Sequence, residues 1–246
     1  MYSFYDLQDK VRRYFRFNND EIKGLLITTL ILAICLSFRQ WGYGETVDVY
    51  YGLKNLLNTF VIVFLAILVH VSAQKVYALH IGYKAEYEMW LSGLIISLFL
   101  TVLTNGYLYF LAIGSFVLHF LHGHRLGYFR FGLNYFAMAI VALMGPLANL
   151  ILALIFKYAM LFSSSPLLPR AMSINLLIAI FSMIPIPPFD GSKVFYASRY
   201  LYAFSVGTVI GAVVFMFFSG AIGTILGSLF VGLLVLLIPL WLDYGR

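Results

Sequence analysis

Long runs without a charged residue dominate the pattern of apolar and polar positions along the chain. A transmembrane helix needs about 20 consecutive apolar residues, with a lower limit of roughly 17, and several runs approach or exceed that length. The last run is long enough for two helices, and Ser219-Gly220 is the expected break between them. The pattern therefore predicts an all-α polytopic membrane protein with about six transmembrane helices. The expected spans cover residues 24–38, 55–74, 89–103, 131–156, 171–184 and 200–242.

Residues 104–135 interrupt this pattern between the third and fourth expected spans. They are rich in aromatic and β-branched side chains with repeated glycine, and no clean helical stripe of apolar residues runs through them. This composition favours a re-entrant or β-hairpin-like segment. Because unpaired backbone groups cannot face lipid, such a segment must lie against protein or at the membrane surface.

Residues 1–23 alternate aromatic and basic side chains, which predicts an amphipathic segment lying in the membrane interface. A solvated arm is the alternative. Residues 24–246 are then expected to form a single membrane-embedded domain. An excess of basic residues before the first span favours a cytoplasmic N-terminus. These residues are Lys10, Arg12, Arg13, Arg16 and Lys23.

Composition agrees with a membrane protein. Hydrophobic residues make up 62% of the chain and charged residues 11%, whereas a soluble domain carries about 25% charged residues. The net charge of +6 comes from basic residues in short stretches between apolar runs. That distribution suits anionic lipid headgroups, and we expect no nucleic-acid partner. The single cysteine, Cys35, excludes an intrachain disulfide and a cysteine-built zinc site. Its apolar neighbours predict a small buried side chain.

Three segments carry candidate chemistry. His70 lies inside the second expected span, where an ionisable side chain is costly and invites a functional hypothesis. The sequence Gly-Pro-Leu-Ala-Asn at 145–149 lies inside the fourth. A run of prolines at 185–188 then breaks a hydrophobic segment and is followed by Asp190 in the sequence Asp-Gly-Ser-Lys.

Together these segments resemble the site-2 protease family of intramembrane zinc metalloproteases, and most closely its small archaeal members. The resemblance covers residues from about 56 to 200. That family has an HExxH helix with two zinc-ligating histidines and a glutamate base, a G-P-x-x-N element, and a proline-rich loop with a ligating aspartate. His70 matches the first histidine, Asn149 the asparagine and Asp190 the aspartate. Residues 107–114 are similar to the family's β-rich element.

The resemblance implies zinc as the cofactor in the family and a transmembrane peptide or protein segment as substrate. It also implies His70 and Asp190 as metal positions and Asn149 as a substrate-binding residue. The family motif is degenerate here, because Val71 stands at the glutamate position and Gln74 at the second histidine. Valine cannot accept a proton, and two strong ligands are fewer than the three that catalytic zinc sites normally use. We therefore expect no catalytic residue, zinc that is absent or weakly bound, and no peptidase activity.

The same residues also have purely structural interpretations. His70 can be a buried, hydrogen-bonded histidine with Asp190 or Asn149 as its neighbour. Asp190 can form a turn with Gly191 or cap a helix that begins there. Asn149 can hydrogen-bond the backbone that the prolines interrupt.

The other four histidines have weaker claims to a metal. His119, His122 and His124 are spaced loosely like metal ligands, but histidines among interfacial aromatic residues usually make ordinary hydrogen bonds. His80 lies near the end of the second expected span, at the depth of the membrane interface.

Three functions remain open. The leading one is a non-catalytic homologue that binds or regulates transmembrane peptide segments. The second is an active zinc-dependent intramembrane endopeptidase, either altered at positions 71 and 74 or holding its metal in another way. The third is a small membrane transporter, for which the spans offer neither the paired charges of an ion path nor a repeated half.

Overall fold

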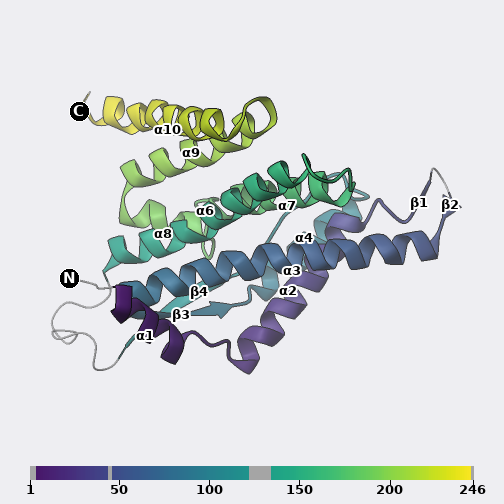
Figure 1. Cartoon of the computed structure of the whole chain (residues 1–246), viewed down its shortest axis with the longest axis horizontal. Helices are drawn as coiled ribbons and strands as arrows, with labels where there is room; N and C mark the ends of the chain where they lie inside the picture. The colour runs from purple at the N-terminus through teal and green to yellow at the C-terminus, as the bar shows by residue number, and fades with distance from the viewer. Residues whose placement is uncertain (1–3, 44–45, 122–133, 245–246) are drawn as a thin grey trace.

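The computed structural model describes residues 4–43, 46–121 and 134–244 (Figure 1). This part of the chain is mostly helical, with two small antiparallel sheets. Its helices are α1 (Phe4–Tyr14), α2 (Asn19–Ser37), α3 (Val49–His80), α4 (Leu91–Leu103), α6 (Tyr135–Ala159), α7 (Leu167–Ser182), α8 (Asp190–Ala197), α9 (Arg199–Phe218) and α10 (Ala221–Tyr244). Its strands are β1 (Gly42–Tyr43), β2 (Thr46–Val47), β3 (Tyr83–Glu88) and β4 (Ser115–Phe120).

Among the described residues, α3, α6, α9 and α10 are long and apolar enough to cross a membrane. The structure therefore supports a membrane protein with four candidate spans among the described residues, and the expected number of six is not confirmed. The apolar helices α4 and α7 have 13 and 16 residues. Both are shorter than the roughly 17 residues that a span needs.

The expected break at Ser219-Gly220 is confirmed, because α9 ends at Phe218 and α10 begins at Ala221. The two helices lie side by side as a hairpin (Figure 1). A Cβ atom at Gly207 would stand 2.8 Å from the Cβ atom of Val235. Glycine at this position therefore allows the two helices to approach closely.

The two central strands correct the prediction of an all-α fold. The structure has an antiparallel pair, β3 with β4, in which Tyr83 faces Phe120 and Glu88 faces Ser115. The expectation of extended structure within 104–135 is right for β4. Its partner, however, is β3, which precedes α4, so β4 and β3 do not form a hairpin inside 104–135. Residues 122–133 lie outside the described part of the chain.

A buried ion pair fixes the N-terminal helices to the core. Lys75 Nζ of α3 lies 2.6 Å from Glu21 Oε1 of α2, and both side chains are almost fully buried. Helix α2 begins at Asn19, five residues before the expected first span, because Glu21 accepts a hydrogen bond from the backbone N–H of Asn18. Residues 1–23 therefore include the helix α1 and the first turn of α2. Their position at the membrane interface stays a prediction.

Helices α3 and α6 form the centre of the molecule. Helix α6 packs against α3, α7 and α8, while α3 also contacts α2 and β3. Cys35 of α2 is fully buried, as its sequence context predicts. The central helices α3 and α6 carry two of the three segments that the sequence singles out, and the third begins α8.

Candidate functional site

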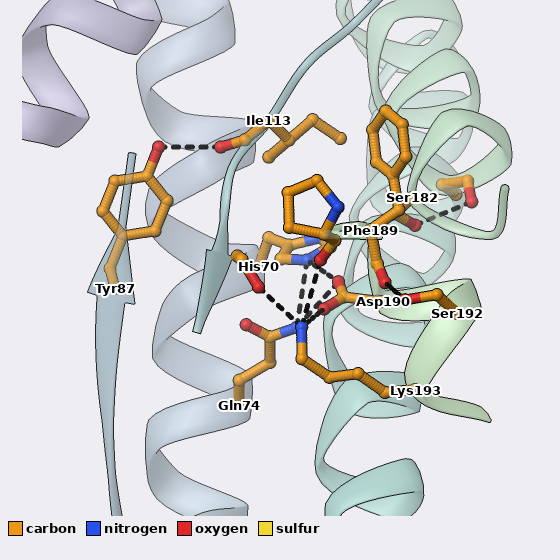
Figure 2. Close-up of polar contacts among 12 residues, drawn as sticks. His70, Gln74, Tyr87, Ile113, Ser182, Phe189, Asp190, Ser192 and Lys193 are labelled. Carbon is orange, nitrogen blue, oxygen red and sulfur yellow. Dashed lines mark hydrogen bonds and ion pairs between the residues drawn. The ribbon is translucent and has the colours of Figure 1, made fainter. Parts of the chain in front are cut away.

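His70, Gln74 and Asp190 meet in one buried cluster (Figure 2). His70 Nε2 lies 2.8 Å from Asp190 Oδ2, and Gln74 Nε2 lies 2.9 Å from the same oxygen. Gln74 Nε2 is also 3.2 Å from His70 Nε2. The three residues expose only 1–4% of their surface, so the cluster is closed to bulk water.

The two elements that carry the cluster follow directly from the sequence. His70 and Gln74 are four residues apart on α3, so they share one face of the helix. Helix α7 ends at Ser182, the prolines prevent it from continuing, and α8 begins at Asp190. Phe189 precedes Asp190 and is 1% exposed, with its ring 5.4 Å from that of Trp90 and 5.7 Å from that of Phe110. This packing fixes the start of α8, and with it the Asp190 carboxylate.

Asp190 does not cap the helix that follows it. The residue in the N-cap position is Phe189, and Asp190 is the first residue of α8. Its carboxylate points to α3, where it accepts hydrogen bonds from His70 and Gln74. Of the structural interpretations, the His70–Asp190 contact is therefore observed and the capping role is wrong.

Gly145 of α6 leaves the space that the His70 ring occupies. A Cβ atom at this position would stand 2.2 Å from His70 Nε2, far inside a van der Waals contact. Gly191 is constrained in the same way, since its Cβ atom would stand 2.2 Å from the carbonyl oxygen of Met183. Both glycines of the recognised segments therefore serve close packing around the cluster.

Lys193 contacts both Asp190 of the buried cluster and Ser115 of β4. This residue was not predicted from the sequence. Its ammonium group lies 3.8 Å from Asp190 Oδ1 and donates hydrogen bonds to Ser115 Oγ at 2.6 Å and to the carbonyl of Pro188 at 3.2 Å. It also lies over the ring of Phe116, 4.3 Å from its centroid. The sequence signal is the spacing of Asp190 and Lys193, three residues apart, which places both on one side of a helix.

Tyr87 of β3 supports the chain on the other side of the cluster (Figure 2). Its hydroxyl donates to the carbonyl of Ile113 at 2.7 Å and lies 2.8 Å from Thr28 Oγ1. Burial raises the pKa of Tyr87, so this phenol stays protonated. It therefore acts as a neutral hydrogen-bonding group that holds the segment before β4 in place.

Val71 packs inside the protein core. It is 2% exposed and belongs to a cluster of buried apolar side chains that includes Ile67, Ile113 and Ile178. The position that carries a glutamate in the resembled family is therefore surrounded by aliphatic groups here. A carboxylate at this position would lose its hydration without a described partner.

Asn149 is fully buried in α6, and neither polar atom of its side chain has a hydrogen-bond partner among the described residues. It is therefore not seen bonded to His70, to Asp190 or to the proline segment. His70 Nδ1 and Asp190 Oδ1 also lack a hydrogen-bond partner in the described part of the chain. Buried polar groups are nearly always paired, so these three side chains mark a site whose hydrogen bonds are incomplete. The substrate-binding role of Asn149 stays a prediction.

The cluster does not fit a zinc ion. The 2.8 Å contact requires a proton between His70 Nε2 and Asp190 Oδ2. This nitrogen is therefore engaged with the carboxylate, and the protonation of the ring decides which of the two atoms donates. The Gln74 amide donates to the same carboxylate oxygen. Within the described chain, no group of three or more His, Cys, Asp or Glu side chains is arranged to hold a metal ion.

The other histidines lie elsewhere. His80 is the last residue of α3, with its ring 5.9 Å from that of Tyr77. His119 lies in β4, half exposed, with Nε2 3.5 Å from Glu86 Oε2. A hydrogen bond from Lys84, with a smaller contribution from His119, lowers the pKa of Glu86. His119 thus takes part in a charged group on the sheet, while His122 and His124 lie outside the described residues.

Comparison with known proteins gives one informative match. The chain is 28% identical over 215 residues to a protein of Methanocaldococcus jannaschii named "Putative zinc metalloprotease". The match covers 83% of this chain and 98% of that protein. The chain matches no family model and no solved structure. The similarity supports a relation to zinc metalloproteases and suggests zinc in the family.

Proposed function

We propose that this chain is a membrane-embedded, site-2-protease-like protein that does not hydrolyse peptide bonds and that binds transmembrane segments of other proteins. The observation that carries the proposal is the hydrogen-bonded cluster of His70, Gln74 and Asp190. In it, His70 Nε2 and Gln74 Nε2 both contact Asp190 Oδ2, at positions that match zinc ligands in the resembled family.

The chemistry of peptide hydrolysis supports the loss of activity. A catalytic zinc lowers the pKa of its bound water to about 7, and a general base adds a factor of about 10²–10⁴. Here the base position is Val71, packed among aliphatic side chains. His70 Nε2 is engaged in a hydrogen bond with the Asp190 carboxylate. Neither contribution is available from these residues.

Binding of a client segment has separate support. Strand β4 pairs with β3 on one side, and within the described residues no strand pairs with its other edge. An extended peptide can add to such an edge through main-chain hydrogen bonds. The Asn149 amide, fully buried and without a hydrogen-bond partner among the described residues, could hydrogen-bond a client only if the helices around it separated. A client that unwinds locally beside β4 would satisfy these groups.

A cleavage assay in proteoliposomes tests the proposal. We expect no cleavage of a model transmembrane substrate by the unmodified chain, with or without added zinc. His70→Ala is the matched control, because it removes the one strong nitrogen ligand. Cleavage that a chelator and His70→Ala both abolish would contradict the proposal and favour the active endopeptidase. No observation on the described residues favours the transporter.

A further inference from the structure

An apolar groove lies between the start of α9 and the end of α10, away from the His70 cluster. It has a volume of about 280 Å³, which is enough for part of an acyl chain. Its walls are formed mainly by aliphatic and aromatic side chains from α8, α9 and α10. They include Phe195, Val206, Val235, Ile238 and Leu242.

Two opposite charges stand among the residues that line this groove. Arg199, the first residue of α9, and Asp243, near the end of α10, both contribute to its lining, and both are exposed. The Tyr200 hydroxyl donates a hydrogen bond to the Asp243 carboxylate. The groove therefore combines an apolar interior with a guanidinium and a carboxylate.

Exposed aromatic residues place this end of the hairpin at the membrane surface. Tyrosine and tryptophan gather at the level of the lipid headgroups, where their rings contact the acyl region and their polar atoms reach water. Four such residues are sequence neighbours of the residues that line the groove on α8, α9 and α10. They are Tyr196, Tyr200, Trp241 and Tyr244, which are 70%, 39%, 75% and 93% exposed. With these aromatic residues in the interface, Arg199 and Asp243 would come to the depth of the phosphate and amine groups.

We infer that the groove binds one phospholipid with a primary amine in its headgroup, such as phosphatidylethanolamine. An acyl chain fills the apolar part between Val206 and Val235. Arg199 contacts the phosphate, because a guanidinium can bind phosphate oxygens through two parallel hydrogen bonds. Asp243 accepts a hydrogen bond from the ammonium group.

The carboxylate decides between lipid classes. An anionic headgroup without an amine would meet Arg199 favourably but would be repelled by Asp243. A choline headgroup carries a positive charge but has no N–H to donate to a carboxylate. Only a headgroup with both a phosphate and a primary ammonium matches both charges.

The site also has a structural consequence for the hairpin. Helix α10 packs chiefly against α9. At the turn, Lys157 of α6 donates to the carbonyls of Met216, at 2.6 Å, and Ser219, and the backbone N–H of Ala221 donates to the Tyr158 hydroxyl at 2.5 Å. A lipid between Arg199 and Asp243 would join the two helices at the opposite end. This inference is independent of the proposed function.

Native mass spectrometry of the detergent-purified full chain tests the site. The protein is titrated with phosphatidylethanolamine, phosphatidylcholine and phosphatidylglycerol of the same acyl chains. The wild-type chain should bind the ethanolamine lipid about tenfold more tightly than the choline lipid, a difference of the order of one charge-assisted hydrogen bond. It should also bind the ethanolamine lipid more tightly than the glycerol lipid.

The variants separate the contributions. Asp243→Asn should weaken the ethanolamine lipid more than the choline lipid and so remove most of the difference between them, because both lose the attraction of the carboxylate but only the ethanolamine lipid loses a charge-assisted hydrogen bond. Arg199→Gln should weaken both by about tenfold, and Val206→Trp should weaken all three by filling the groove. Lys54→Gln, which removes an exposed cation at the start of α3, should change nothing. If Arg199→Gln does not fold, Arg199→Lys keeps the charge without the planar fork and should show a smaller loss of both lipids.

Three results would overturn the inference. The first is equal binding of the ethanolamine and choline lipids by the wild-type chain. The second is binding of the glycerol lipid as tight as that of the ethanolamine lipid. The third is unchanged lipid affinity in a folded Arg199→Gln variant.

Discussion

Helix α3 contributes to two buried polar groups, the Lys75–Glu21 ion pair and the cluster of His70, Gln74 and Asp190. The two groups differ in how many of their polar atoms have a hydrogen-bond partner. Lys75 pairs with Glu21, and both Glu21 oxygens accept further donors, Oε1 from the backbone N–H of Tyr87 at 2.7 Å and Oε2 from that of Asn18 at 2.8 Å. Lys75 in turn donates to the carbonyl of Arg16 at 3.1 Å. This pair is satisfied as a structural group should be.

The cluster of His70, Gln74 and Asp190, in contrast, has polar atoms without a hydrogen-bond partner. His70 Nδ1 and Asp190 Oδ1 have no hydrogen-bond partner in the described chain, and the nearby Asn149 amide has none at either atom. A protein that needed these residues only for stability would gain by pairing or replacing them. The difference indicates that Lys75 and Glu21 stabilise the fold, and it agrees with the proposal that His70 and Asp190 occupy the positions of a former metal site.

Breaking the Lys75–Glu21 pair should have the largest effect on stability. Lys75→Met leaves the Glu21 carboxylate buried without its cation, and the loss of a partner from such a pair costs about 3–5 kcal/mol. Chemical unfolding in detergent measures the change. The double variant Lys75→Met with Glu21→Gln is the control and should recover part of the loss, because it removes the buried charge but keeps only one of the two acceptor oxygens. A single variant as stable as the wild type would show that the pair does not hold α2 on α3.

The Gly145→Ala substitution should cause the second largest loss of stability. Its Cβ atom would stand 2.2 Å from His70 Nε2, and relief of such overpacking costs about 1–3 kcal/mol. The loss should disappear in the His70→Ala background, where the ring is absent. A double-mutant cycle on unfolding free energies measures this coupling. Equal losses in both backgrounds would mean that Gly145 is needed by α6 itself.

Asp190→Asn should cost less, about 1 kcal/mol, the usual net value of one hydrogen bond. The asparagine oxygen can still accept from Gln74 or His70, and only one carboxylate oxygen is hydrogen-bonded in the wild type. The same unfolding experiment gives the value. A loss of stability as large as that of Lys75→Met would show that the His70–Asp190 cluster stabilises the fold as much as the Lys75–Glu21 pair does.

Asn149→Leu should have the smallest effect on stability, within about 1 kcal/mol and of either sign, because no hydrogen bond is lost and a buried polar group is removed. If Asn149 binds a client, the same variant should lose photo-crosslinking of a transmembrane peptide from a probe at Val117, an exposed residue of β4. Crosslinking at the wild-type level would exclude Asn149 from client binding.

The sequence predicted the elements whose signal is local. The glycine after Ser219 marked the end of α9, and the prolines after Ile184 marked the end of α7. Strand β3 was not predicted, because the sequence analysis rests on uncharged runs and β3 carries the charged residues Lys84, Glu86 and Glu88. Their alternation with the buried Tyr83, Ala85 and Tyr87 was a readable strand signal.

The candidate site was predictable only in part. The resemblance named His70, Asn149 and Asp190, and the structure brings His70 and Asp190 into direct contact. The environment of Val71, the closeness of Gly145 and the link from Lys193 to Ser115 depend on residues that are distant in sequence. Periodicity and composition carry no information on which of these side chains meet.

Zinc content is the most direct test of the central claim, which is that Gln74 and Val71 have removed the metal and the base from an otherwise retained site. The full chain is purified with zinc present, dialysed and analysed for metal beside the double variant Val71→Glu with Gln74→His. The account predicts far less than one zinc per unmodified chain, and a rise in the variant that His70→Ala reverses. One tightly held zinc per unmodified chain, lost on His70→Ala, would contradict it.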